Sequence, residues 1–136
     1  SIKIHQTDLN LTSVVKTKLD PFNLAPEQNL IMMLLWEKDG LTQNQVAQLL
    51  DKDKTNIARM VSNLESKGFS KRVGCPNDRR SLKLYLSPKG EELNEQVAPV
   101  LEEFNDIICA GISQEEIAFM ETILMKFNKN VQKFNE

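Results

Sequence analysis

Residues 42–68 contain two short amphipathic segments with almost no chain between them, and this feature constrains the fold more than any other. Thr42 is followed three residues later by Gln45, the pattern of a capping box, which predicts the start of a short helix. A second helix is predicted to begin after Asp53, a residue type favoured as an N-cap, and to end at Gly68. Two helices joined by so short a connection form a helix-turn-helix.

The pattern of the second helix separates a buried face from an exposed one. Its apolar residues recur at the i, i+3, i+4, i+7 spacing of a single helix face. They are Ile57, Met60, Val61 and Leu64. The opposite face and the first turn should therefore face solvent. These positions carry Lys54, Thr55, Asn56, Ala58, Arg59 and Ser62.

The exposed residues of this helix suit the major groove of DNA. An arginine such as Arg59 can hydrogen-bond guanine in a fork, an asparagine such as Asn56 suits adenine, and small residues allow close approach. Backbone N–H groups at the first turn of the helix also favour phosphate. A solvated helix face is the alternative interpretation. The short partner helix before it and the hairpin predicted after it favour DNA binding.

A β-hairpin is predicted directly after the second helix. Turn residues and alternating apolar residues predict strands at 69–73 and 82–86, with a loop at 74–80. The loop places Arg79 and Arg80 at the tip of the hairpin, where guanidinium groups suit the negative potential of a narrow minor groove. A hairpin in this position is the wing of a winged helix-turn-helix.

Other polar residues around these elements are expected to have supporting roles. We expect Asp78 to orient a neighbouring arginine of the wing through a bidentate ion pair. Contacts to phosphate give affinity without sequence information. Five residues are predicted to make them: Thr42, Gln43, Lys71, Arg72 and Lys83.

Helices are also predicted on both sides of the winged segment, over residues 2–20, 26–38, 88–110 and 114–134. The first and the last two carry more apolar residues than a small winged domain can bury, which predicts burial against a second copy of the chain. We therefore divide the chain into an N-terminal dimerisation helix (1–24), a winged helix-turn-helix DNA-binding domain (25–87) and C-terminal dimerisation helices (88–136).

The distribution of charge supports a nucleic-acid partner. The whole chain has a net charge of −2, but residues 41–90 hold ten Lys and Arg against four Asp and Glu, and the remainder holds seven against fifteen. Such asymmetry is typical of a segment that binds a polyanion. No apolar run approaches the roughly 18 residues needed to cross a membrane. The two cysteines fit a reducing, cytoplasmic setting.

The segment "GLTQNQVAQLLDKDKTNIARMVSNLESKGFSKRV", followed by "NDRRSLKLYLSPKGEEL", resembles the winged helix-turn-helix of the MarR (multiple-antibiotic-resistance regulator) family of bacterial transcription factors. The resemblance implies a mainly α fold with a small β-hairpin wing, embedded in a helical dimerisation region. It also implies a cytoplasmic homodimer that binds double-stranded DNA at a pseudo-palindromic operator, with repression as the default outcome.

The same resemblance implies an effector that lowers DNA affinity, such as a small phenolic or amphipathic compound. Candidate residues for its pocket are Met32, Met33, Trp36 and His5. Methionine and tryptophan at helical spacing are more often core residues, so the alternative is ordinary packing.

Two other functions remain open. Cys75 lies between basic residues of the predicted wing, and its oxidation would alter the wing, although the reactive cysteine of oxidant-sensing relatives lies near the N-terminus and has no counterpart here. A winged helix that binds protein instead of DNA is the second alternative. An enzyme is disfavoured, because no Cys/His/Asp cluster has metal-ligand spacing and no glycine-rich loop follows a strand, and we expect neither a metal nor a cofactor.

Overall fold

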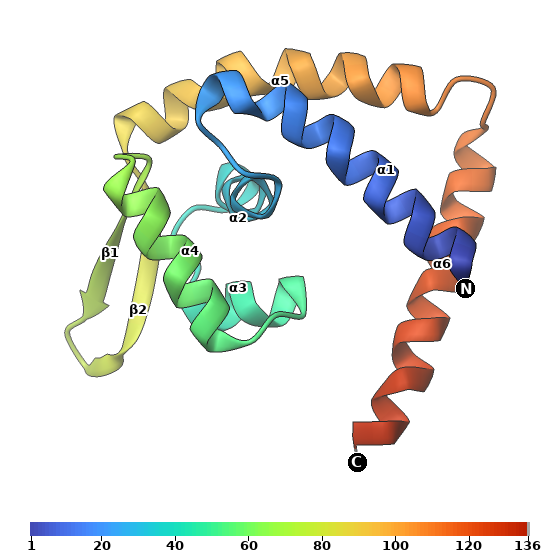
Figure 1. The fold of residues 1–136 in the computed structure, drawn as a ribbon. Helices are drawn as coiled ribbons and strands as arrows, with labels where there is room; N and C mark the ends of the chain where they lie inside the picture. Colours follow the sequence, from blue (N-terminus) through green and yellow to red (C-terminus); the bar gives the residue numbers. More distant parts are fainter. Residues whose placement is uncertain (136) are drawn as a thin grey trace. The chain divides into compact units, whose positions relative to one another are not determined.

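The computed structural model describes residues 1–135, apart from the side chains of Arg79 and Arg80. The described chain forms six α-helices and one antiparallel β-hairpin (Figure 1). In order they are α1 (Ile2–Leu19), α2 (Pro26–Glu37), α3 (Gln43–Leu50), α4 (Lys54–Ser66), β1 (Ser70–Cys75), β2 (Asp78–Leu86), α5 (Pro88–Ile108) and α6 (Gln114–Val131). Short 3₁₀ turns follow α1 (Asp20–Phe22) and α6 (Gln132–Asn135). The predicted fold class, mainly α with a hairpin wing, is confirmed.

The chain divides into two compact units, Ser1–Leu101 and Glu102–Glu136. The first unit holds the helix-turn-helix and the wing, together with α1, α2 and most of α5. The second unit holds the last part of α5 and all of α6. No helix of the described chain is long and apolar enough to span a membrane.

The core of the first unit forms where α2, α3, α4, the hairpin and α5 meet. Burial of its apolar side chains removes surface from water and is the main favourable contribution to folding. The predicted stripe of α4 lies within this core, which confirms the assignment of its buried face. The core residues are Leu19, Leu24, Ile31, Met32, Leu35, Leu41, Val46, Ala47, Ile57, Met60, Val61, Leu64, Phe69, Leu84, Leu93 and Val97.

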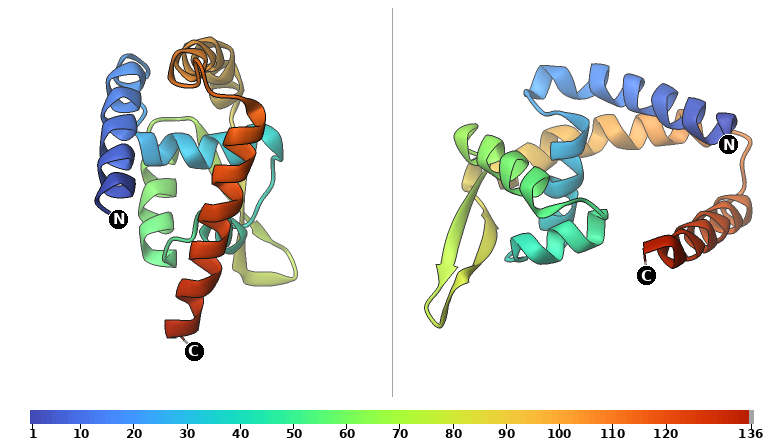
Figure 2. Two further views of the ribbon diagram at one scale, coloured as in Figure 1. Left: turned by 90° about the vertical axis from the view of Figure 1, so that its right-hand side faces the viewer. Right: turned by 60° about the horizontal axis from the view of Figure 1, so that its bottom comes forward.

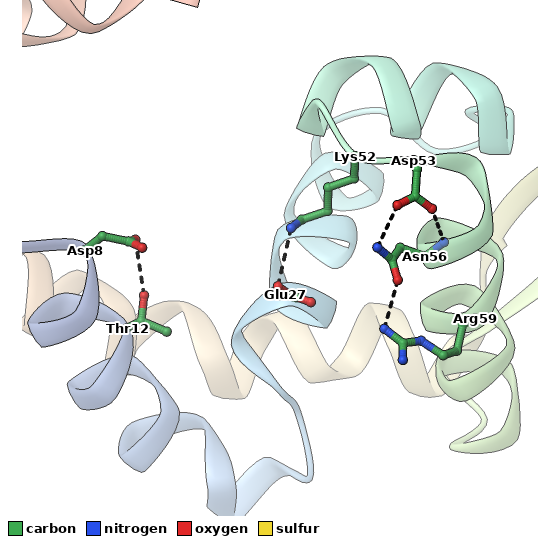
Figure 3. Close-up of polar contacts among 7 residues, drawn as sticks. All are labelled: Asp8, Thr12, Glu27, Lys52, Asp53, Asn56 and Arg59. Atoms are coloured by element: carbon green, nitrogen blue, oxygen red, sulfur yellow. Dashed lines mark hydrogen bonds and ion pairs between the residues drawn. The ribbon is translucent and has the colours of Figure 1, made fainter. Parts of the chain in front are cut away.

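Local hydrogen bonds begin α3 and fix the turn that follows it. The Thr42 hydroxyl accepts from Gln45 N at 3.1 Å, and Gln45 Oε1 accepts from Thr42 N at 2.8 Å, so the predicted capping box is confirmed. After α3, Asp51 takes a left-handed conformation with φ of 52°, which turns the chain toward α4. Lys52 forms an ion pair with Glu27 at 3.3 Å and joins this turn to the first turn of α2 (Figure 3).

The hairpin is longer than predicted. Its strands reach Cys75 and Asp78, so the predicted loop over 74–80 is wrong, and a two-residue turn at 76–77 joins them. The pairing shifts between Gly74, which lies opposite Leu82, and Cys75, which lies opposite Asp78. Residues 79–81 therefore form a bulge in β2. A bulge interrupts the alternation of side chains, and this is why the pattern of alternating residues underestimated the strand.

Backbone hydrogen bonds join the wing to the connection between α2 and α3. Gly40 N donates to Leu84 O at 2.9 Å, and Leu84 N donates to Leu41 O at 2.7 Å. Gly40 has a φ of +82°, and a Cβ there would lie 3.1 Å from the Tyr85 ring. Asp39 Oδ1 accepts from the backbone of β2 at 2.9 Å. The wing is thus held at its base, and it projects from the helices (Figure 2).

Candidate nucleic-acid interface

The outward face of α4 carries the predicted recognition residues. Lys54, Thr55, Asn56 and Arg59 are exposed, while Ala58 and Ser62 are half-buried. α4 contacts α3 through one side and β1 through another, which leaves this face to solvent (Figure 1). The structure therefore presents the six residues together on the exposed side of one helix.

Three side chains at the start of α4 form a continuous chain of hydrogen bonds (Figure 3). Asp53 Oδ1 accepts from Asn56 N at 2.8 Å, which caps the helix. The second carboxylate oxygen, Oδ2, accepts from Asn56 Nδ2 at 2.8 Å. Asn56 Oδ1 in turn accepts from Arg59 Nη2 at 3.0 Å. The Asp53 cap was predicted from the sequence, whereas its second contact and the link to Arg59 were not.

The predicted phosphate contacts differ in how free their side chains are. Lys71 and Lys83 are exposed on the wing. Arg72 instead donates from Nε to Glu65 Oε2 at 3.1 Å, an ion pair that joins β1 to α4. The Arg72 backbone N donates to the same oxygen at 3.2 Å. Arg72 thus holds the wing against the helix.

The other predicted contacts lie at the start of α3 and along β2. Thr42 and Gln43 are half-buried. Gln43 Oε1 is buried without a hydrogen-bond partner among the described residues. Asp78 is exposed at the start of β2. The side chains of Arg79 and Arg80 lie outside the described residues, so their predicted insertion into a minor groove stays a prediction.

Lys67, one of the basic residues of the central segment, has a structural role that the sequence did not reveal. Its ammonium donates to Asn23 O at 2.8 Å and to Gln28 Oε1 at 2.7 Å. Burial lowers the pKa of Lys67 from the ordinary value of 10.5. Lys89 is also engaged, because it donates to Lys67 O at 3.0 Å and lies over the Phe69 ring. Neither lysine belongs to the exposed face of α4.

The four residues predicted for an effector pocket differ in how far they are buried. Met32 is fully buried in the core, and Trp36 is half-buried and donates from its ring nitrogen to Gly90 O at 2.9 Å. Met33 and His5 are exposed. A cavity of about 350 Å³ lies between the 3₁₀ turn after α1 and the start of α5, lined by residues other than these four. The effector pocket stays a prediction.

The remaining candidate chemistry concerns cysteine and metal ions. Cys75 is a free, half-buried thiol at the end of β1. Within the part of the chain that the structure describes, no group of His, Cys, Asp and Glu is arranged to hold a metal ion. The redox role of Cys75 stays a prediction.

Comparison with known proteins points to one family. The sequence profile described as the MarR family matches residues 24–82. YybA, an uncharacterised HTH-type transcriptional regulator of Bacillus subtilis, is 23% identical over 123 residues, which span 90% of this chain and 82% of YybA.

Two solved structures show the same fold. The Staphylococcus aureus MepR–DNA complex superposes with a TM-score of 0.86 at 25% identity and covers 96% of each chain. A putative MarR family regulator from Listeria monocytogenes, complexed with 26mer DNA, has a TM-score of 0.84 at 24% identity and covers 95% of this chain and 86% of its own. The likeness extends over nearly the whole chain, well beyond the matched profile. The predicted resemblance to the MarR family is therefore confirmed, and the chain is similar over nearly its whole length to DNA-binding transcriptional regulators of that family.

Proposed function

We propose that two copies of this chain bind one pseudo-palindromic DNA duplex, with α4 of each copy in the major groove of one half-site. The observation that carries the proposal is the exposed face of α4, where Asn56 and Arg59 lie at the first turns between small residues. This combination offers donors and acceptors to base edges while allowing close approach of the helix. Relatives of the same fold have been crystallised with DNA, which supports this use of the helix.

The wing supplies the second set of DNA contacts in this proposal. Arg79 and Arg80 enter the minor groove beside the half-site, and Asp78 orients one of them. Lys71 and Lys83, which are exposed on the two strands, contact phosphate. The base of the wing is fixed by Asp39 and Arg72, which supports a defined position of the hairpin relative to α4.

Dimerisation is proposed from the apolar surface of the terminal helices. α6 has no buried residue within the single chain. Its large apolar side chains are therefore open to solvent: Phe119, Met125 and Phe127 are 68%, 71% and 52% exposed. α1 likewise exposes Ile2 and Leu9. Monomeric proteins rarely leave so many large apolar side chains in water, so burial against a second copy is the simplest solution. Residues 1–24 and 88–136 are accordingly the dimerisation segments, and 25–87 the DNA-binding domain.

The regulatory outcome proposed is repression in the cytoplasm. A dimer with half-sites one helical turn apart, about 34 Å, covers enough of a promoter to exclude polymerase. A small amphipathic or phenolic effector then relieves repression by favouring a conformation of the dimer with a different spacing of the two α4 helices. The family resemblance is the support for this part of the proposal.

A fluorescence-anisotropy titration tests DNA binding and stoichiometry together. Labelled duplexes of about 20 bp, one selected from a random pool and one of shuffled sequence, are titrated at about 50 and about 200 mM salt. We expect saturation at two protomers per selected duplex, a clear preference over the shuffled duplex and a steep loss of affinity with salt. No binding at the lower salt would contradict the proposal and favour the protein-binding alternative.

A further inference from the structure

We infer that Asp53 is a specificity-determining residue that positions Asn56 and, through it, Arg59 for base recognition. This role goes beyond capping α4, and it rests on the proposed function of α4 as the recognition helix. The evidence is the hydrogen-bond chain that joins the three side chains along one face of the helix (Figure 3).

The carboxylate of Asp53 selects one orientation of the Asn56 amide. An ionised carboxylate only accepts hydrogen bonds, so the amide must turn its NH₂ group toward Asp53. The observed contact, Nδ2 to Oδ2 at 2.8 Å, has this arrangement. The reversed amide would place Asn56 Oδ1 against the carboxylate, where two acceptors repel. Because the other carboxylate oxygen accepts from Asn56 N at 2.8 Å, Asp53 itself is held in place by the cap.

The fixed amide then orients the guanidinium of Arg59. With its NH₂ group toward Asp53, Asn56 turns Oδ1 toward the next turn of the helix, where it accepts from Arg59 Nη2 at 3.0 Å. A reversed amide would present a donor to another donor, and the contact would be lost. Arg59 is exposed and has a long flexible side chain, so this hydrogen bond reduces the conformational entropy that it loses on binding.

These hydrogen bonds leave enough donors and acceptors of Asn56 and Arg59 free to contact bases. Asn56 keeps one N–H and one lone pair of its amide, the pair of groups that adenine requires. Arg59 keeps its remaining N–H donors, enough for the two acceptors of guanine. Asp53 therefore fixes the order of donors and acceptors along α4 without contacting a base. Its negative charge also lies near the DNA, where it opposes phosphate.

Two substitutions separate this role from capping. Asp53→Ser keeps an oxygen that can cap α4 but removes the oxygen that accepts from Asn56 Nδ2. Asp53→Asn is nearly isosteric and keeps a capping oxygen, but it presents an amide that favours the reversed orientation of Asn56. We expect both variants to unfold thermally near the parent temperature, because serine, asparagine and aspartate are comparable N-caps.

DNA titrations of the two variants should show an affinity for shuffled DNA that is unchanged or higher and a sequence preference that is lower. Both variants should bind shuffled duplexes at least as tightly as the parent, because a negative charge near phosphate is removed. Their preference for the selected duplex over one with substituted contact bases should fall by about fivefold or more, within the range of a single base contact. In an Asn56→Ala background, Asp53→Ser should leave the remaining preference unchanged, because the intermediate amide is absent. An unchanged preference in both single variants would overturn the inference.

Nuclear magnetic resonance of the free protein separates failure of this inference from failure of the proposed function. We expect the side-chain NH₂ resonances of Asn56 to move in Asp53→Ser, while those of the exposed Asn63 on the same helix do not. If the Asn56 resonances moved in Asp53→Ser but the parent protein showed no sequence preference for DNA, the contact would be established and the proposed function contradicted. Unmoved Asn56 resonances would overturn the inference whatever the DNA binding.

Discussion

Lys67 Nζ donates to Gln28 Oε1 at 2.7 Å and thereby joins the end of α4 to a buried glutamine in the first turn of α2. The same ammonium donates to Asn23 O at 2.8 Å, in the connection between α1 and α2. Gln28 Oε1 also accepts from Ala25 N at 3.2 Å, so one amide oxygen connects two segments. The position of α4 is thus fixed at its C-terminal end by a polar contact as well as by its apolar stripe.

Replacing Lys67 with methionine should destabilise the protein without altering the exposed face of α4. The variant loses two charge-assisted hydrogen bonds, and we expect the free energy of unfolding to fall by about 1–3 kcal/mol. Urea unfolding at a fixed protein concentration measures it, with Lys71→Met as the matched control because Lys71 is exposed. Equal stability of the two variants would show that the contacts of Lys67 contribute nothing net.

The same residue predicts a pH dependence. Burial lowers the pKa of Lys67 in the folded state below its ordinary value of 10.5, so the unfolded chain binds more protons at this site as that pH is approached. The contribution of Lys67 to the free energy of unfolding should therefore rise with pH in the alkaline range up to about 10.5. Lys67→Met should lack this rise. A difference between parent and variant that shrinks with rising pH would contradict the assignment.

Replacing Gly90 with alanine should destabilise the protein, although alanine has the higher helix propensity. Gly90 lies in the first turn of α5, where a Cβ would overlap the carbonyl oxygen of Phe69. Alanine normally favours a helix over glycine by about 1 kcal/mol, yet we expect Gly90→Ala to destabilise the protein by about 2 kcal/mol or more, because α5 must move away from the backbone of Phe69. Gly74→Ala is the control, since nothing lies within 4 Å of its Cβ position. Thermal unfolding compares the two, and a stabilised Gly90→Ala would refute the contact.

Arg59 and Lys71 should contribute to DNA binding in different ways. Arg59→Ala removes a base contact, so we expect a loss of about 1–3 kcal/mol on the selected duplex and a relaxed sequence preference. Lys71→Ala removes a phosphate contact and should weaken selected and shuffled duplexes alike, with a flatter salt dependence. Anisotropy titrations of both variants measure the difference. If Arg59→Ala kept the preference of the parent, the recognition helix would be assigned wrongly.

The dimer can be tested on the exposed apolar face of α6. Phe127→Lys places a charge where 52% of a phenylalanine is exposed in the single chain, and Asn128→Lys adds the same charge one residue later. We expect the first variant to shift from twice the chain mass of 15.5 kDa toward the monomer, because a desolvated charge opposes burial. The second should remain dimeric. Size-exclusion chromatography with light scattering distinguishes them, and a parent protein of monomer mass would exclude the dimer.

Local sequence determined the helix-turn-helix almost completely. Thr42 with Gln45 and Asp53 with Asn56 satisfy the first backbone donors of α3 and α4, and these pairs lie only three residues apart. The stripe beginning at Ile57 assigned the buried face of α4 because helical periodicity is a local property. The exposed face of α4 followed from the same periodicity, so the residues proposed to contact DNA were identified before their hydrogen bonds were known.

Tertiary structure decided which polar residues remain available to DNA. Arg72 and Lys67 look like their exposed neighbours in the sequence. In the structure Arg72 pairs with Glu65, and Lys67 donates to Gln28, which lies 39 residues away in the chain. The bulge over 79–81 also depends on the pairing of two strands. Such contacts form only when distant segments meet in the folded chain, and periodicity and capping rules describe neighbours alone. The sequence therefore determined the helices and their faces, and the packing of distant segments decided which charges fix the wing and which face solvent.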